Sequence, residues 1–236
     1  MTRAAALALA ALVVGCGGSD SGRPTVFAAA SLTEVFQELD PEARFNFAGS
    51  DELAAQLREG AEADVYAAAS PTYPEQLFAE GLVEEPRVFA TNRLVLIVPA
   101  ANEAGVESLR DLDRPGVKLV VGAEGVPIGD YTREVLDRAG ASAVLDRVVS
   151  EEQDVKGIVG KVALGEADAG FVYATDAHAA GSDVRAIELP TAAAVDIGYL
   201  IAIVRGGDRV AAHAFVDLVL SGRGRAALAA AGFGPP

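Results

Sequence analysis

The sequence predicts an α/β protein in which any two domains are interwoven rather than joined in series. Short apolar runs typical of strands alternate with segments of helical spacing, an order that indicates parallel sheets covered by helices. The chain has 236 residues, enough for one large or two small domains at about 150 residues each. No Pro/Gly-rich linker separates the middle of the chain into halves. Two domains would therefore have to exchange segments.

The alternating pattern gives a definite order of elements. The clearest helix is 153–164, where Val155, Ile158, Val159 and Val162 recur at helical spacing and form one apolar stripe. The expected strands are 25–30, 44–48, 65–69, 94–99, 117–122, 169–173, 184–189 and 199–204. The expected helices are 32–38, 51–59, 74–80, 108–112, 129–138, 153–164, 211–220 and 222–230.

The first strand-to-helix corner has an unusual composition. The apolar run 26–30 stops at Ser31, and an amphipathic pattern begins at once. Ser31 and Glu34 have the spacing of a capping box, in which each side chain bonds a free amide at a helix start. The small residues at this corner predict open space beside a hydroxyl.

Composition excludes several classes of partner. Hydrophobic residues make up 51% and charged residues 22% of the chain, so a packed core is expected and disorder is not. The net charge of −15 argues against nucleic acid, whose phosphates require basic patches. It also argues against electrostatic docking on anionic lipid.

The N-terminus is typical of an export signal. A short positive start precedes the apolar run 4–14, which is too short to span a membrane. The run ends in Val13-Val14-Gly15-Cys16, which resembles the lipobox of bacterial lipoproteins and holds the chain's one cysteine. We therefore expect a signal peptide at 1–15 and a lipidated Cys16 that begins a flexible tether, 16–24. The alternative is an ordinary secretory signal with an incidental cysteine.

Motifs for catalysis or metal binding are weak. His178 and His213 have no partner motif, and a surface role is favoured for both. The sequence has no zinc-ligand spacing and no Cys cluster. Ser50 does not lie in a GxSxG motif, and Gly160-Lys161 lies inside a helix rather than in a Walker loop.

Helix starts offer a different chemistry. Ser31, Ser50, Gly129 and Val155 each lie where a strand passes into a helix. Free amides and the helix dipole at such points can bind an anion without any arginine. A single serine there is most simply a plain cap, so an anion site requires that these corners converge in space.

Six motifs follow one another along the chain, namely TVFAAASLTEVF, FNFAGSDELAAQLREGAEADVYAAAS, RLVLIVP, GVPIGDYTREVLDRAG, EEQDVKGIVGKVALGEADAGFVYATDA and the closing GFG. Together they resemble the periplasmic molybdate-binding proteins of ABC importers. The resemblance runs from Thr25 to Phe233. It implies the bilobal periplasmic-binding-protein type II fold, with two interwoven α/β lobes joined by a hinge. Lobe 1 would be 25–91 plus 198–236, and lobe 2 would be 92–197.

The resemblance also implies the ligand residues. Two hydroxyls, two backbone amides and one phenol would hold the oxyanion, namely those of Ser31, Ser50, Ile128, Val155 and Tyr173.

The sequence departs from the family pattern at three places. The segment between Ser31 and Phe47 is shorter than expected, so the first helix should be short. Asp51 follows Ser50 directly, and we expect its carboxylate to point outward because an inward charge would repel a dianion. Ile128 is bulkier than the usual small residue, which is compatible with binding if its amide alone faces the ligand.

The implied function is capture of molybdate or tungstate outside the cytoplasmic membrane, either on a lipid anchor or in a periplasm. The partners would be the permease and ATPase of an ABC importer, and the receptor would be a monomer without a cofactor or enzymatic activity. One alternative is the same fold binding sulfate or phosphate. Another is a serine hydrolase on an α/β scaffold, which would need a base beside Ser31 or Ser50.

Overall fold

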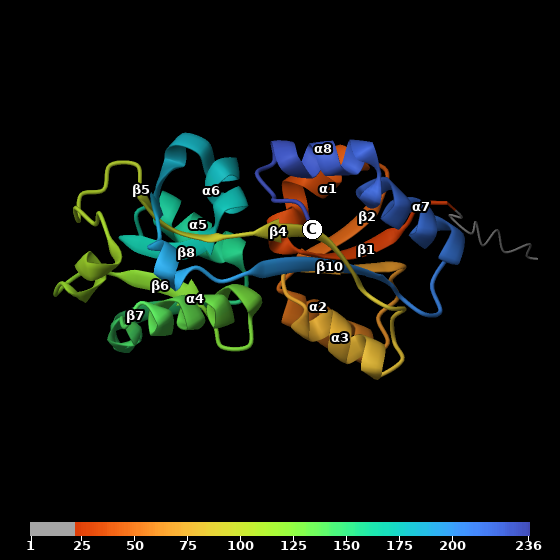
Figure 1. Ribbon diagram of the computed structural model, residues 1–236, viewed down its shortest axis with the longest axis horizontal. Coiled ribbons are helices and arrows are strands. Elements are labelled where there is room, and N and C mark those ends of the chain that lie inside the picture. The colour runs from red at the N-terminus through yellow and green to blue at the C-terminus, as the bar shows by residue number, and fades with distance from the viewer. Residues whose placement is uncertain (1–21) are drawn as a thin grey trace, which may run out of the picture.

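Two five-stranded mixed sheets form the centres of two lobes that lie side by side (Figure 1). The computed structural model describes residues 22–236, so the predicted signal segment, Cys16 and most of the tether lie outside the described residues. Lobe 1 contains β1 (Thr25–Ala29), α1 (Thr33–Leu39), β2 (Arg44–Ala48), α2 (Ser50–Arg58), β3 (Val65–Ala68), α3 (Thr72–Ala79), β4 (Arg87–Asn92), β10 (Ile197–Ile203), α7 (Arg209–Leu220) and α8 (Gly222–Ala230). Lobe 2 contains β5 (Leu94–Pro99), β6 (Leu119–Gly122), α4 (Pro127–Arg138), β7 (Val148–Glu152), α5 (Val155–Ala163), β8 (Ala169–Tyr173), α6 (Ala174–Ala180) and β9 (Val184–Glu188).

The two sheets have matching topologies. Lobe 1 has the strand order β2-β1-β3-β10-β4, and β10 runs antiparallel to both of its neighbours. Lobe 2 has the order β7-β6-β8-β5-β9, and β5 is the antiparallel strand there. The parallel strands of each sheet feed helices at their carboxyl ends, and those ends face the other lobe (Figure 1). This edge is where α/β proteins bind ligands.

The chain passes between the lobes through extended segments. It leaves lobe 1 between β4 and β5 and returns between β9 and β10, so lobe 1 contains both ends of the described chain. The predicted α/β class and interwoven arrangement are therefore confirmed. The expected boundaries at 91/92 and 197/198 fall within β4 and β10, and the position at which the lobes separate stays a prediction.

An aromatic cluster fixes the helices of lobe 1 on their sheet. Phe36 of α1 packs edge-on against Phe215 of α7, with ring centroids 5.2 Å apart, and also contacts Phe45 and Phe89 from the sheet. Burial of a phenylalanine side chain typically contributes about 1.5–3 kcal/mol. This cluster holds α1 close to β1, and so it fixes the corner at Ser31.

Glycines allow the helices of lobe 2 to approach their sheet. A Cβ atom on Gly129 would lie 2.0 Å from the carbonyl oxygen of Ala123, so the first turn of α4 rests directly on the loop after β6. Likewise, a Cβ on Gly170 in β8 would lie 2.6 Å from Cγ2 of Ile158. The apolar stripe of α5 therefore packs against β8 as the helical spacing predicts, with Val155, Ile158 and Val162 buried.

Some elements differ from the expectations. The edge strands β4 and β7 were not predicted, because edge strands bury few side chains and lack a continuous apolar run. The expected helix 108–112 is a 3₁₀ helix at Leu109–Asp113. Helix α5 begins two residues later than expected, at Val155, because the Asp154 side chain caps it by accepting from the amide of Gly157.

Candidate functional site

A small cavity lies between the lobes, and all five sequence-predicted residues line it. Ser31 and Ser50 come from lobe 1, whereas Ile128, Val155 and Tyr173 come from lobe 2. The cavity measures about 20 Å³, little more than the room one water molecule needs. The structure thus brings together five corners that are distant in the sequence. Their role as ligands of an oxyanion stays a prediction.

Ser31 does not cap a helix. It lies inside the 3₁₀ helix Ala30–Leu32, whereas α1 begins at Thr33, so the capping-box prediction is wrong. The Glu34 carboxylate turns instead to Nζ of Lys156, at 2.7 Å. The Ser31 Oγ lies 2.8 Å from the hydroxyl of Tyr199 in β10, and both side chains are buried.

Ser50 is also free of a capping role. Gly49 occupies the cap position of α2, and Ser50 is the first helical residue. The backbone amide of Ala69 donates to Ser50 Oγ at 3.1 Å, and the Tyr66 hydroxyl donates to the Ser50 carbonyl at 2.6 Å. Because its oxygen already accepts one hydrogen bond, the Ser50 hydroxyl can offer its proton to the cavity.

Two helices of lobe 2 direct free amides at the cavity. Ile128 is in the first turn of α4, and Val155 is the first residue of α5. Amides at these positions have no partner within their own helix, and neither bonds another described residue. Both helices are long enough, at 12 and 9 residues, to carry a positive dipole end at the cavity. The arrangement suits an anion.

The Ile128 side chain leaves the cavity open by packing toward the sheet. Its Cγ2 lies 2.6 Å from the point where Gly122 would carry a Cβ. Ile128 is therefore accommodated because β6 ends in glycine. The bulk of this residue does not prevent its amide from facing the cavity.

Tyr173 supplies a buried polar group without a partner. Its side chain is 2% exposed and lines the cavity, and its hydroxyl forms no hydrogen bond with any described residue. Burial raises the pKa of this phenol well above its usual value, so the group stays protonated and is a donor at neutral pH. A buried donor without an acceptor is costly. This group therefore points to a ligand.

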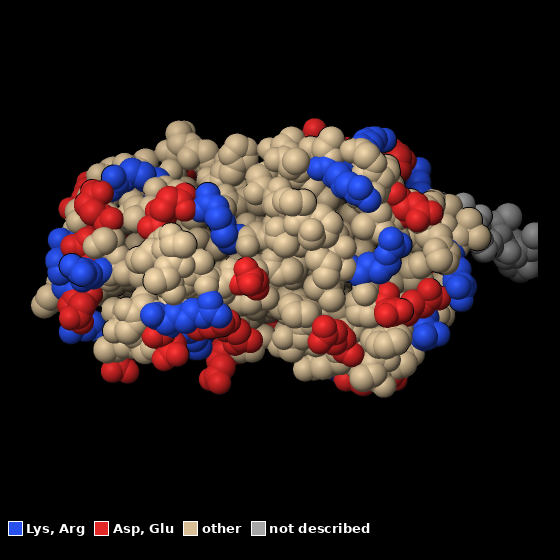
Figure 2. Space-filling view, in the orientation of Figure 1, with Lys and Arg blue, Asp and Glu red and all other residues tan. Residues whose placement is uncertain are grey.

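The cavity lining carries no basic side chain among the described residues. The one acidic residue there, Asp154, turns its carboxylate to the Gly157 amide. On the face shown in Figure 2, charged side chains gather mostly toward the outer parts of the lobes, and the middle has few. An anion in this cavity would be held by neutral donors.

Asp51 does not point outward as expected. Its carboxylate is absent from the cavity lining, but its Oδ1 is buried and lacks a hydrogen bond in the described part of the chain. Burial raises the pKa of Asp51, the backbone amides of Asp51 and Glu52 lower it, and the charges of Glu52 and Asp130 raise it by smaller amounts. The Asp51 Oδ1 would lie 2.6 Å from a Cβ on Gly49, so the carboxylate folds back toward the preceding residue. One carboxylate oxygen is therefore buried rather than exposed, but the carboxylate does not line the cavity.

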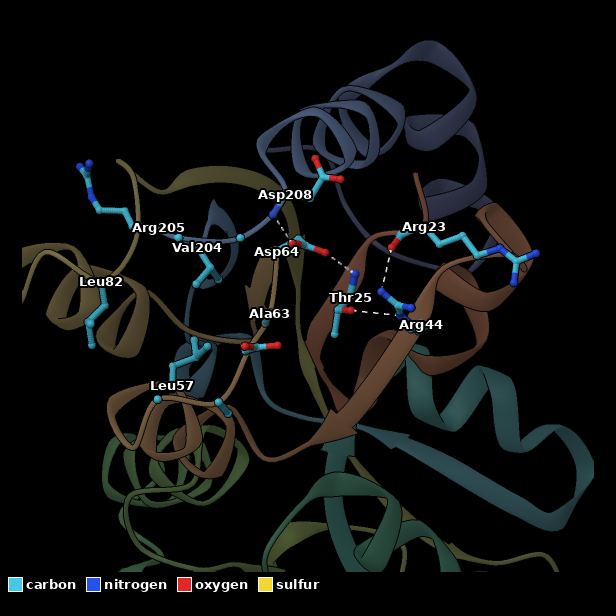
Figure 3. A pocket seen from close by; sticks show the side chains of 15 residues that line it. Arg23, Thr25, Arg44, Leu57, Ala63, Asp64, Leu82, Val204, Arg205 and Asp208 are labelled. Atoms are coloured by element: carbon cyan, nitrogen blue, oxygen red, sulfur yellow. Dashed lines mark hydrogen bonds between the residues drawn. The ribbon is translucent and has the colours of Figure 1, made fainter. Parts of the chain in front are cut away.

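A larger hollow lies at the other end of lobe 1 (Figure 3). It measures about 520 Å³ and contains Asp64, whose carboxylate accepts from the amides of Thr25 and Asp208 at 2.7 and 2.6 Å. These bonds tie β1, β3 and the start of α7 together. The Asp64 carboxylate is therefore satisfied within the protein, and none of the five predicted ligand residues lines this hollow.

The described residues offer no alternative centre for catalysis or metal binding. No group of three or more His, Cys, Asp or Glu side chains in this part of the chain could hold a metal ion. His178 and His213 are both exposed and do not line the cavity. His178 shares a neighbouring hollow with Ser31, but the hydrogen bonds of the Ser31 and Ser50 side chains within the described residues go to Tyr199 and to the Ala69 amide rather than to a histidine.

Residues 24–234 match the family described as bacterial extracellular solute-binding protein. The chain belongs to this family. Among its relatives, the molybdate-binding protein ModA of Mycobacterium tuberculosis is 37% identical over 250 residues, covering 97% of this chain and 95% of ModA. The molybdate-binding protein ModA of Escherichia coli is 30% identical over 232 residues, covering 90% and 89% of the two chains.

Solved structures show the same fold. The periplasmic molybdate-binding protein of Azotobacter vinelandii superposes with a TM-score of 0.77 at 20% identity. The superposition covers 91% of this chain and 100% of that chain. The sulfate-binding protein SubI of Mycobacterium tuberculosis gives 0.76 at 17% identity, with coverages of 90% and 86%. The bilobal binding-protein fold implied by the sequence motifs is thereby confirmed.

Membership in this solute-binding family defines the class of activity. The protein is a binding component of transport that acts outside the cytoplasm, and it is not an enzyme. Among the described residues, no helix is both long and apolar enough to cross a membrane.

Sequence reasoning did not identify the groups that support the two serines. Tyr199 begins a predicted strand and looked like an ordinary core residue, while the amide of Ala69 leaves no sequence signal. The closing Gly-Phe-Gly was part of the resemblance, and Phe233 packs edge-on against Tyr199 with ring centroids 5.2 Å apart. That contact links the motif to the site.

Proposed function

We propose that this protein captures molybdate or tungstate between its lobes and delivers it to an ABC importer. The observation that carries the proposal is the unpartnered Tyr173 hydroxyl, buried in a cavity that it shares with two serines and two free helix amides. Five neutral donors from two lobes suit a small tetrahedral dianion. The curated relatives named as molybdate-binding proteins support the same ligand class.

The donors select by size. A donor set fixed for a larger tetrahedral ion cannot reach a smaller one at every position, and each lost hydrogen bond to a buried donor costs roughly 1–3 kcal/mol. Tungstate should therefore compete almost evenly with molybdate, whereas sulfate and phosphate should compete poorly. The solved sulfate-binding relative shares only the fold and does not favour sulfate here.

Calorimetry with an oxyanion panel tests the proposal. The mature chain would be titrated with molybdate and tungstate, and sulfate and phosphate would be used as competitors. Ser31→Ala and Ser50→Ala should each weaken molybdate binding by about tenfold to a hundredfold, the equivalent of one charge-assisted hydrogen bond. His213→Ala, at an exposed position on α7, is the matched control and should bind normally.

Two results would overturn the assignment. Sulfate that binds within a few-fold of molybdate would exclude a molybdate receptor. Normal binding by the Ser31→Ala/Ser50→Ala double variant would place the site elsewhere. The hydrolase alternative has no support from the hydrogen bonds of the two serines, since within the described residues Ser31 pairs with Tyr199 and Ser50 with the Ala69 amide, neither of them a base.

The mode of attachment is also part of the proposal. We infer that the protein is exported by residues 1–15, lipidated at Cys16 and held as a monomer outside the cytoplasmic membrane by the tether up to Pro24. Its partners are then the permease and ATPase of the importer, and its oxyanion is cargo rather than a cofactor. Cys16→Ser should release the protein from the membrane fraction or block its processing. Normal cleavage and membrane retention of that variant would exclude the lipid anchor.

A further inference from the structure

Ser31 is one end of a buried chain of polar groups. Its Oγ lies 2.8 Å from the Tyr199 hydroxyl, and the side-chain amide nitrogen of Asn92 lies 3.4 Å from that same hydroxyl. Ser31 is 5% exposed and Tyr199 is fully buried. Both hydroxyls are shielded from bulk water, so the direction of the hydrogen bond between them is set by the protein groups around them.

The backbone fixes the direction at Asn92. The Asn92 Oδ1 accepts from the amide of Arg93 at 2.9 Å, so its NH₂ group must be the end that faces Thr175 and Tyr199. An NH₂ group only donates, so the Tyr199 oxygen accepts from it. The Tyr199 proton is then directed to its other neighbour, Ser31 Oγ.

This order leaves the proton of Ser31 free. Because its oxygen accepts from Tyr199, and no other hydrogen bond involves its side chain in the described structure, the serine can offer its proton to the cavity it lines. The proton of the Ser50 hydroxyl is also free to donate, because the Ser50 oxygen accepts from the Ala69 amide. Both serines therefore face a ligand as donors.

We propose that Tyr199 is a positioning residue that holds Ser31 as a hydrogen-bond donor to the oxyanion. Three aromatic rings fix its own ring at centroid distances of 5.2 to 6.2 Å, those of Phe233, Tyr173 and Phe89. Tyr199 does not line the cavity, so it acts through Ser31. The ligand oxygen that suits this serine is an unprotonated one. This inference rests on the proposed function.

A double-mutant cycle tests the assignment. Molybdate affinity would be measured by calorimetry for wild type, Tyr199→Phe, Ser31→Ala and the combined variant. Tyr199→Phe preserves the ring packing and should weaken binding about three- to tenfold, the scale of one hydrogen bond. In the Ser31→Ala background the same substitution should cost less than twofold, because the serine through which it acts is gone.

Ser50 provides the matched background. Tyr199 contacts Ser31 and not Ser50, so Tyr199→Phe should keep its full three- to tenfold cost in Ser50→Ala protein. A purely structural role of Tyr199 would give the same cost in all three backgrounds. That result, or normal binding by Tyr199→Phe, would overturn the proposal.

Asn92→Ala is a second, independent variant should Tyr199→Phe fold poorly. Asn92 is half-buried at the end of β4, and its loss removes the donor that sets the direction of Tyr199. Its effect should likewise disappear in the Ser31→Ala background, and an undiminished effect there would count against the proposal. Normal binding by Ser31→Ala itself would instead refute the proposed oxyanion site. Failure of the positioning role of Tyr199 can therefore be told apart from failure of the proposed function.

Discussion

Gly49 of lobe 1 lies against the backbone carbonyl of Gln153 in lobe 2, so closely that a Cβ on this glycine would be 2.6 Å from the carbonyl oxygen. Its φ of −59° is accessible to any residue, and the glycine is therefore not required by the backbone of lobe 1. The contact exists because two lobes meet there. A Cβ here would also lie 2.6 Å from Oδ1 of Asp51, but that side chain can rotate away, whereas the Gln153 carbonyl is part of the backbone. A side chain at this position would therefore hold the lobes apart.

Gly49→Ala should therefore weaken closure rather than folding. We expect molybdate affinity to fall at least about tenfold, since donors on the two lobes could no longer reach one ligand together. Calorimetry gives the affinity, and small-angle scattering with saturating molybdate should show a more extended particle than wild type.

Gly160→Ala is the matched control for this test. Gly160 lies on α5 with no atom near its would-be Cβ, and alanine there should stabilise the helix by about 0.5–1 kcal/mol without changing affinity. Wild-type affinity and scattering for Gly49→Ala would show that this contact does not limit closure.

Lys156 forms an ion pair between the lobes on another side of the cavity. Its Nζ lies 2.7 Å from Glu34 of α1 and 3.2 Å from Asp176 of α6. Glu34→Gln should weaken molybdate binding less than about fivefold, because partly exposed ion pairs contribute about 0–1 kcal/mol. The loss should disappear in high salt, which screens the pair in wild type.

Arg58→Met serves as the control for the ion pair. It removes the pairing with Glu80, 2.9 Å away, which joins α2 and α3 within lobe 1. This substitution should leave affinity unchanged at any salt concentration. A Glu34→Gln effect of equal size at low and high salt would argue against an electrostatic contribution to closure.

Tyr73 of α3, in lobe 1, donates a hydrogen bond to the backbone carbonyl of Gly125 in lobe 2. Gly125 precedes α4, whose first turn presents the Ile128 amide to the cavity. Tyr73→Phe should accelerate molybdate release about three- to tenfold with little change in the association rate, because the bond forms after the lobes meet. Stopped-flow measurements separate the two rates. A slower association with unchanged release would contradict this reading.

The sequence predicted most of the cavity but little of what organises it. Ser31, Ser50, Ile128, Val155 and Tyr173 lie in motifs with a local signature, since each ends a buried strand or begins a helix. These corners meet because the carboxyl ends of parallel strands share one edge of each sheet.

The supporting contacts could not be inferred in this way. The Ser31–Tyr199 contact joins residues 168 positions apart. The Gly49–Gln153 contact joins the two lobes, and the spacing of residues within either motif carries no information about it. One oxygen of Asp51 is buried, whereas helical position alone suggested an exposed side chain.

The burial of Asp176 predicts a pH-dependent stability. The residue is 2% exposed, and its carboxylate oxygens make no hydrogen bond within the described chain, although Lys156 lies 3.2 Å from Oδ1. Burial raises the pKa of Asp176 to about 7, the Lys156 ammonium lowers it, and Glu34 and Asp154 raise it further. The usual value for an aspartate in an unfolded chain is about 3.9.

The sign of the effect follows from proton binding. The pKa of Asp176 is about 4 in the unfolded chain and about 7 in the folded protein. Between these two pH values the folded protein holds a proton on Asp176 that the unfolded chain has released. The free energy of unfolding therefore decreases as the pH rises through this window, and the decrease caused by Asp176 is complete above about pH 7.

Asp176→Asn removes the ionisable group and should relieve this penalty. The gain in free energy of unfolding should be larger at pH 8 than at pH 5 by about 3 kcal/mol, because roughly two pKa units of about 1.4 kcal/mol each lie between pH 5 and the folded-state pKa. Urea unfolding at the two pH values measures the difference. Asp146→Asn, at an exposed position, removes the same charge from this acidic chain and should show no such change between the two pH values. A gain for Asp176→Asn of the same size at pH 5 and pH 8 would show that Asp176 is already ionised at pH 5 in the folded protein.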